Sequence, residues 1–126
     1  MDMKQSGLNP GPVFDWPSED SSQVPLWVYT DRENYQRELE RIFYGPYWSF
    51  VGVDTEVPNV GDYKRAVIGE RSVLMLRAKD GSISVVLNSC AHRGAELCQA
   101  RFGKQEHIMC PYHQWTYDLK GNLVGV

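Results

Sequence analysis

The fold of this chain is decided by two short stretches, CAHRG at residues 90–94 and CPYHQWTYD at residues 110–118. Each stretch carries one cysteine and one histidine in the pattern C-x-H…C-x2-H, with 17 residues between the two halves. Both residue types are common metal ligands in proteins. The four candidate ligands are Cys90, His92, Cys110 and His113.

Two thiolates and two imidazoles suit a [2Fe–2S] centre in which two His replace two Cys on one iron. Two ferric ions, two sulfides, two thiolates and two neutral imidazoles sum to zero charge, whereas four thiolates leave the oxidised cluster with a double negative charge. A less negative cluster accepts an electron more readily. This ligand set therefore predicts a one-electron carrier with a potential of about −150 to +300 mV, against about −400 mV for plant-type ferredoxins.

A tetrahedral zinc site is the alternative for the same four side chains, because Cys2His2 sets also bind zinc. Zinc fingers usually place both cysteines on one knuckle and both histidines on a helix. Here each loop contributes one of each, which favours two irons with different ligands. A zinc-stabilised interaction module stays open as a second interpretation.

The residues around the candidate ligands fit two tight loops. Gly94 can adopt a positive φ where the backbone curls, and Pro111 fixes φ in the second loop. Trp115 and Tyr112 are expected to shield the site or to pack in the core of a small β domain. Arg93 is expected to pair with a carboxylate or to help dock a redox partner, and a solvated arginine is the alternative.

One cysteine and one histidine lie outside the pattern. Cys98 is expected to be a small buried residue, and His107 is expected to be a strand residue at the surface. With two of the three cysteines assigned to iron, no pair is left for a structural disulfide, which agrees with a reducing compartment.

Length and composition predict one small domain, since the chain has 126 residues of which 42% are hydrophobic. The 13 basic and 16 acidic residues leave a net charge of −3, so no basic face for nucleic acid is expected. No apolar run approaches the roughly 20 residues that cross a bilayer, and no signal-peptide core follows Met1. We therefore expect a cytoplasmic protein without a membrane or nucleic-acid partner.

Residues 1–29 are expected to form an extended arm, because Pro, Gly and Ser are frequent there. A helix is predicted over residues 30–45, since Thr30 and Glu33 have the spacing of a capping box and Gly45-Pro46 stops it. Its apolar stripe is predicted to pack on its own domain or, alternatively, on a part of the protein outside this chain. The stripe comprises Tyr35, Leu39, Ile42 and Phe43.

From residue 46 to residue 126 the pattern changes to short strands, which predicts a mainly β domain of antiparallel sheet. Asp80-Gly81 is a strong hairpin signal, and a further turn is predicted at residues 120–122. The two metal-binding loops then become neighbouring hairpin tips. Strands are predicted at residues 48–53, 63–68, 72–77, 83–87, 108–109 and 115–117.

The two loops resemble the Rieske domain that opens the large (α) subunit of aromatic-ring-hydroxylating non-haem iron oxygenases. The resemblance covers residues 25–126 and includes the predicted helix, which free-standing Rieske ferredoxins generally lack. It is greatest with large subunits that act on hydroxy- or amino-benzoates, such as salicylate 5-hydroxylase and anthranilate 1,2-dioxygenase. Many relatives carry Gly where this chain has Gln114.

The resemblance implies a Rieske-type fold and an oxidoreductase of aromatic catabolism. A reductase or ferredoxin fed by NAD(P)H would reduce the 2Fe-2S cluster, which would serve a mononuclear Fe(II) in a neighbouring large subunit of a trimer. There O2 would be activated and an aromatic acid hydroxylated, with a small β subunit as a further partner.

Histidines are too few in this chain for that mononuclear iron. Such a site uses two His and one carboxylate, and only His107 remains after His92 and His113. We therefore expect the catalytic domain to be absent from this chain, which would then be a fragment. A stand-alone Rieske ferredoxin, a carrier with no substrate of its own, is the alternative function.

Overall fold

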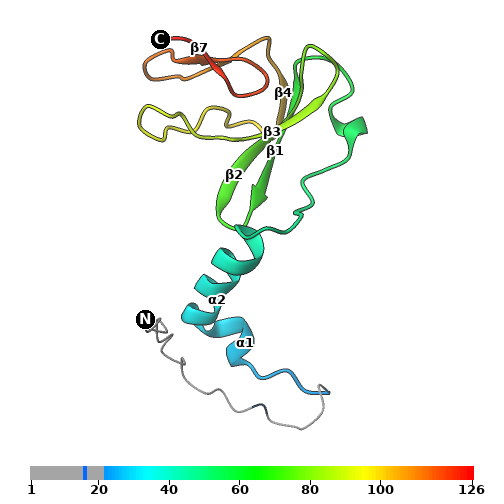
Figure 1. The fold of residues 1–126 in the computed structure, drawn as a ribbon, viewed down its shortest axis with the longest axis vertical. Helices are drawn as coiled ribbons and strands as arrows, with labels where there is room; N and C mark the ends of the chain where they lie inside the picture. Colours follow the sequence, from blue (N-terminus) through cyan, green and yellow to red (C-terminus); the bar gives the residue numbers. More distant parts are fainter. Residues whose placement is uncertain (1–15, 17–21) are drawn as a thin grey trace, which may run out of the picture. The chain divides into compact units, whose positions relative to one another are not determined.

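The structure is a computed structural model that describes residue 16 and residues 22–126 (Figure 1). Two compact units can be distinguished, Met1–Gln36 and Arg37–Val126. Most of the predicted arm lies outside the described residues. Its described part contains one helical turn, α1 (Trp27–Thr30), so the expectation of an extended chain is wrong there.

The main helix, α2 (Arg32–Glu38), begins two residues later than predicted, and its cap is Asp31. The backbone N–H of Asn34 donates to Asp31 Oδ1 at 2.7 Å. The hydroxyl of Thr30 instead donates to the carbonyl of Leu26 in the preceding turn. A charged carboxylate beside the helix N-terminus is a stronger cap than a hydroxyl that is already engaged.

The helix ends with a single π-helical turn, η1 (Leu39–Phe43), two residues before the predicted end. Leu39 is the buried member of the apolar stripe. Its side chain packs against Gly69, where an added Cβ would lie only 2.8 Å from Leu39 Cδ2. The hydroxyl of Tyr44 accepts the backbone N–H of Glu70 at 3.0 Å, and the guanidinium of Arg71 lies 3.7 Å from the centre of the Tyr44 ring. The end of the helix therefore packs on its own domain, as predicted for the stripe, although Leu39 alone of the stripe is buried there.

The prediction of a strand at residues 48–53 is wrong. This segment is irregular and leads into a short 3-10 helix, η2 (Asp54–Glu56), which begins where Glu56 Oε2 accepts the backbone N–H of Val53 at 3.0 Å. Trp48 and Phe50 are exposed. Their alternation resembles a strand, but the segment pairs with no strand in the described part of the chain, and a strand depends on its ladder of hydrogen bonds.

The remaining fold is antiparallel β, as predicted, and it forms two sheets with strand orders β3-β2-β1-β4 and β5-β6-β7. The predicted strands at 63–68, 72–77 and 83–87 are confirmed to within one residue. The short strands predicted at 108–109 and 115–117 are also present, the second one residue shorter than predicted, whereas β4 and β7 were not predicted. The bounds are β1 Asp62–Ile68, β2 Arg71–Arg77, β3 Ile83–Leu87, β4 Phe102–Lys104, β5 Ile108–Met109, β6 Thr116–Tyr117 and β7 Leu123–Gly125.

The core lies where these two sheets meet, and it includes the sulfur atoms of the two loops. Central strand β2 is covered on both faces, with four consecutive buried residues, Val73 to Leu76. Leu74 and Leu76 belong to one cluster with the side chains of Cys90 and Cys110. Within the described residues, no helix is long and apolar enough to cross a membrane.

Gly103 in β4 leaves room for the ring of Tyr63, which lies opposite it in β1. A Cβ at Gly103 would lie 2.5 Å from Tyr63 Cε1, and this ring is rigid and buried. We expect Gly103→Ala to lower the free energy of unfolding by about 1–3 kcal/mol, as overpacking does. Urea denaturation checks this, with Gly125→Ala as the matched control, since a Cβ at Gly125 meets nothing closer than 3.6 Å. Equal stability of the two variants would contradict the packing explanation.

Candidate metal centre

The four predicted ligands lie on two loops of the same backbone geometry. The first loop (residues 90–95) lies between β3 and β4, and the second loop (residues 110–115) joins β5 to β6. In each loop the backbone N–H of the cysteine donates to the carbonyl five residues on, at 2.8 Å in both cases. The carbonyl of each cysteine accepts the N–H four residues on, at 2.8 Å in the first loop and 3.1 Å in the second. Figure 1 shows the two loops, yellow and orange, projecting from the same side of the sheets.

Both loops turn through a residue with positive φ. Gly94 has φ +74° in the first loop, which confirms the prediction for this glycine. Gln114 has φ +62° at the equivalent place in the second loop, and it is the one non-glycine residue with positive φ among the described residues. A side chain in this left-handed region costs roughly 1–2 kcal/mol. The loop geometry therefore favours glycine over glutamine at this position.

Gln114→Gly is expected to raise the free energy of unfolding by about 0.5–1 kcal/mol. The glycine removes the left-handed strain, and its greater freedom in the unfolded chain takes back part of that gain. Urea denaturation of both proteins measures the difference. A glycine variant that is less stable than the parent would show that the Gln114 side chain makes a compensating interaction.

The two cysteine thiols lie at the inner end of the site. Cys90 and Cys110 are each only 2% exposed. A hydrogen bond with the hydroxyl of Tyr117, whose oxygen lies 3.3 Å from Cys90 Sγ, lowers the pKa of the Cys90 thiol. The same oxygen accepts the backbone N–H of Ala91 at 3.0 Å. Tyr117 therefore favours the thiolate form of Cys90, which is the form that binds metal.

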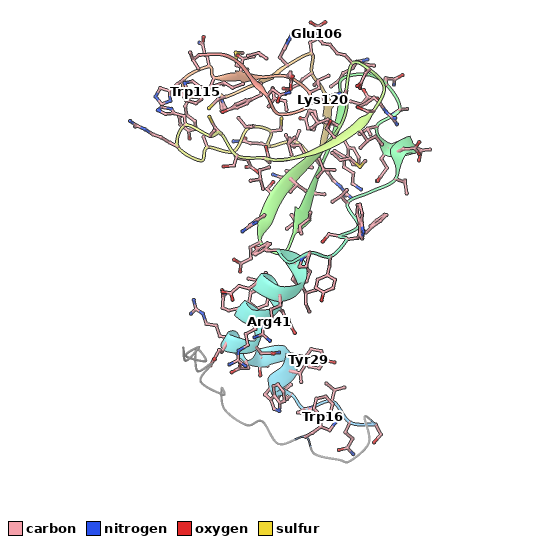
Figure 2. All side chains as sticks on the ribbon, in the orientation of Figure 1. Trp16, Tyr29, Arg41, Glu106, Trp115 and Lys120 are labelled. Carbon is pink, nitrogen blue, oxygen red and sulfur yellow. The ribbon has the colours of Figure 1, made fainter. Side chains whose placement is uncertain are left out.

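The two imidazoles lie further out than the thiols. The rings of His92 and His113 are 4.8 Å apart between centroids and nearly perpendicular. His92 also stacks on Trp115, with 5.0 Å between the centroids and 17° between the planes. Trp115 lies at the side from which the loops project (Figure 2). Its stacking supports the predicted shielding role, whereas Tyr112 is 73% exposed and does not pack in the core.

A single open cavity of about 550 Å³ joins all four side chains. Arg93 and Glu96 supply its charged lining. Within the described part of the chain, no three His, Cys, Asp or Glu side chains converge as ligands of one metal ion. Buried thiols on one side and more exposed imidazoles on the other are a donor set that fits two irons with different ligands. The residues present therefore fit a [2Fe–2S] cluster.

The other candidate residues lie outside this donor set. Cys98 is buried, as predicted, and its burial raises the pKa of its thiol. His107 is exposed, as predicted, but it precedes β5 instead of lying in a strand. Arg93 is exposed, and among the described residues it forms no ion pair.

Tyr117 is the functional residue that the sequence did not reveal. It contacts Cys90, which is 27 positions away in the chain, and nothing in the local pattern indicates this pairing. The signal that was available is its place seven residues after Cys110 in a motif that already pointed to a metal site.

Comparison with known proteins agrees with this geometry. A family model described as the Rieske [2Fe-2S] domain matches residues 47–126. The large oxygenase component of salicylate 5-hydroxylase from Ralstonia sp. is 56% identical over 91% of this chain and 28% of that protein. The anthranilate 1,2-dioxygenase large subunit of Burkholderia cepacia is 46% identical over 88% of this chain and 26% of its own length.

Solved structures support the same relationship. Naphthalene 1,2-dioxygenase from Rhodococcus sp. bound to indole superposes with a TM-score of 0.74 at 43% identity, over 82% of this chain and 23% of that chain. The chain thus spans less than a third of the length of the curated relatives it matches. It belongs to the Rieske [2Fe-2S] domain family, and the curated relatives it resembles are the large subunits of oxygenases.

Proposed function

We propose that this chain is the electron-transfer domain of the terminal oxygenase of an aromatic-ring-hydroxylating system. In this proposal Cys90 and Cys110 bind the inner iron of the cluster, and His92 and His113 bind the outer one. The observation that carries the proposal is the pair of matched loops, which bring two buried thiols and two outer imidazoles to one cavity. When bound, the cluster supplies a one-electron couple, and the protein side chains orient and shield it.

The chain's own residues have distinct tasks in this proposal. Stacking on Trp115 orients the imidazole of His92. The hydroxyl of Tyr117 donates to the Cys90 thiolate while it holds the N–H of Ala91. Burial of both thiols keeps water from the inner half of the site. The more exposed imidazoles lie on the side where an electron donor or acceptor can approach.

Relatives suggest the remaining parts of the system. By their similarity we propose an NAD(P)H-dependent reductase or ferredoxin as donor and a mononuclear Fe(II) in a neighbouring large subunit of a trimer as acceptor. The substrate would be an aromatic acid of the salicylate or anthranilate kind, and a small β subunit would be a further partner. A cytoplasmic setting is supported by the three free thiols, which are ordinary in a reducing compartment.

Potentiometric titration of the anaerobically loaded protein, followed by EPR, tests the electron-transfer role. We expect one reversible one-electron couple between about −150 and +300 mV, with a rhombic signal after reduction. A couple near −400 mV would contradict the mixed ligand set. Absence of any couple in loaded protein would contradict the function altogether.

The coding sequence downstream of Val126 tests the oxygenase part of the proposal. A following domain with two histidines and one carboxylate suited to a mononuclear iron supports it. A stop codon directly after Val126 would favour a stand-alone electron carrier instead.

Tyr117→Phe is expected to lower the midpoint potential by about 60 mV, which is a tenfold change in a one-electron equilibrium constant. The lost hydroxyl donates to a sulfur that becomes more negative on reduction, so its removal destabilises the reduced form more than the oxidised one. The same titration measures the shift, with Tyr112→Phe as the control, because the Tyr112 side chain is largely exposed. An unchanged midpoint in Tyr117→Phe would exclude a tuning role for this hydroxyl.

A further inference from the structure

Asn88 is the one buried residue with an amide or charged side chain among the described residues, and it is only 3% exposed. It follows directly after β3 (Ile83–Leu87) and precedes Cys90 by two positions. A buried amide is costly unless its donors and acceptors are paired. The position of Asn88 at the entrance to the first loop therefore calls for an explanation.

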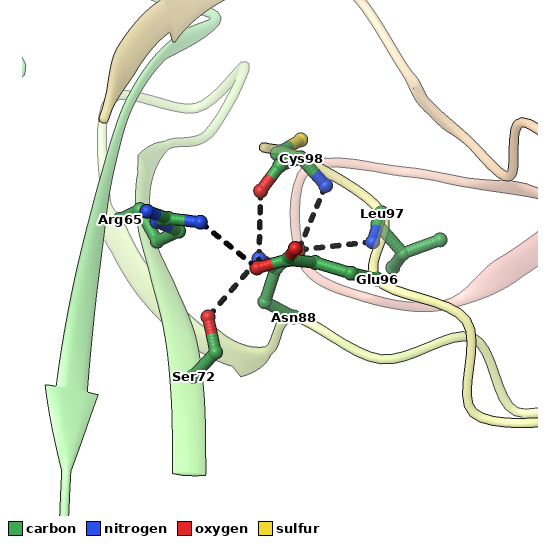
Figure 3. A network of polar contacts seen from close by, with 6 residues as sticks. All are labelled: Arg65, Ser72, Asn88, Glu96, Leu97 and Cys98. Carbon is green, nitrogen blue, oxygen red and sulfur yellow. Dashed lines mark hydrogen bonds and ion pairs between the residues drawn. The ribbon is translucent and has the colours of Figure 1, made fainter. Parts of the chain in front are cut away.

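The side chain of Asn88 is fully engaged by the segment that leaves the first loop (Figure 3). Its Oδ1 accepts the backbone N–H groups of Leu97 at 3.2 Å and Cys98 at 2.8 Å. Its Nδ2 donates to the carbonyl of Cys98 at 2.8 Å, and it also lies near Ser72 Oγ at 3.1 Å and Glu96 Oε1 at 3.2 Å. The amide thus takes the place of a paired strand for Leu97 and Cys98.

The two loops differ in how their bases are closed. At the base of the second loop, β5 and β6 pair through Met109–Thr116 and Ile108–Tyr117. No strand pairing closes the base of the first loop, because residues 88–98 contain no strand. There the Asn88 side chain joins the residue that enters the loop to the residues that leave it. The Asn88 amide therefore closes the base of the first loop, as the β5–β6 pairing closes the base of the second.

The outer edge of this network ties the loop base to strand β1. Glu96 Oε1 accepts from Arg65 Nη1 at 3.0 Å as well as from Asn88. Both charged side chains are well exposed, so this ion pair is expected to contribute little by itself. The hydrogen bonds of the buried Asn88 amide are therefore the main interactions that close the base of the first loop.

We propose that Asn88 is a positioning residue for the metal centre. By closing the base of the first loop it determines where Cys90 and His92 stand relative to Cys110 and His113. Cluster retention and midpoint potential therefore depend on it. This inference rests on the proposed function, because the four side chains are ligands only if that function is correct.

The test compares Asn88→Asp with two matched controls in the loaded protein. Asn88→Asp keeps an acceptor for Leu97 and Cys98 but loses the donor to the carbonyl of Cys98. Should this variant not fold, Asn88→Ser removes the same hydrogen bond to the carbonyl of Cys98 without adding charge. Ser72→Ala deletes a peripheral partner only, and Val57→Ala weakens a buried site that lies outside the cluster containing both thiols.

We expect Asn88→Asp to lose iron to a chelator at least tenfold faster than the parent and to shift the midpoint potential and the EPR g-values. Ser72→Ala should stay within about twofold of the parent rate. Val57→Ala should lower overall stability while leaving the potential and g-values unchanged. An Asn88 variant that matches Val57→Ala in potential and g-values overturns the positioning role.

Hydrogen exchange of the metal-free chain separates this inference from the proposed function. Asn88→Asp should speed exchange of the N–H groups of Cys90 and Cys98 at least tenfold, with those of Cys110 and Gln114 unchanged. That result supports loop closure even if the parent binds no cluster, an outcome that would overturn the proposed function instead. Faster exchange that is uniform over both loops would overturn the inference.

Discussion

Replacing Cys110 with serine is expected to abolish cluster binding. The thiol of Cys110 is buried beside that of Cys90 and lines the cavity, and the Cys110 backbone is fixed in the second loop by hydrogen bonds of its N–H to Trp115 and of its carbonyl to Gln114. Cluster irons are held by thiolates, and a serine hydroxyl does not ionise at neutral pH. Iron content and visible absorbance of the anaerobically loaded variant measure the loss.

Cys98→Ser is the matched control for this experiment. Cys98 is the third cysteine, and it is also buried, but it lies outside the cavity that joins the four candidate ligands. We expect this variant to bind iron at the parent level, with at most a loss of stability. Equal loss of iron in both serine variants would show that general unfolding, not ligation, causes the effect.

Replacing His92 with cysteine is expected to lower the midpoint potential by roughly 100–300 mV in any cluster that forms. One imidazole exchanged for one thiolate adds a negative charge, which takes the cluster part of the way from the Rieske range toward the plant-type value of about −400 mV. The variant also loses the ring that stacks on Trp115. Potentiometric titration of the loaded variant gives the shift.

His107→Cys is the control for this second prediction, because it makes the same substitution at an exposed histidine away from the cavity. Its midpoint should equal that of the parent. If His92→Cys also kept the parent midpoint, the charge argument and the assignment of His92 as a ligand would both be wrong.

Local patterns in the sequence were sufficient for much of the fold. Short apolar segments bounded by turn residues predicted three long strands, and Asp80-Gly81 predicted the hairpin between β2 and β3, where Gly81 indeed has φ +83°. The spacing of cysteine and histidine predicted the two loops that the structure brings together. These features depend on residues that are near one another in the chain.

The errors arose where distant residues or competing partners decide the structure. Thr30 fits a capping box by spacing, but the carboxylate of Asp31 caps the helix. Trp48 and Phe50 alternate like a strand, yet no strand in the described residues pairs with them. Sequence spacing does not report which partner a backbone will find.

The same limit applies to the site itself. The four candidate ligands follow from spacing, but the residues that support them do not. Tyr117 reaches Cys90 across 27 positions, and Asn88 reaches Cys98 across ten. Both contacts exist only once the two sheets and the first loop have formed.

Elemental analysis of anaerobically prepared, fully loaded protein tests the central claim most directly. A site of two thiols and two imidazoles that holds a pair of bridged irons should yield two irons and two acid-labile sulfides per chain. One zinc per chain with no sulfide would contradict the account, because the same four side chains would then hold a single metal ion.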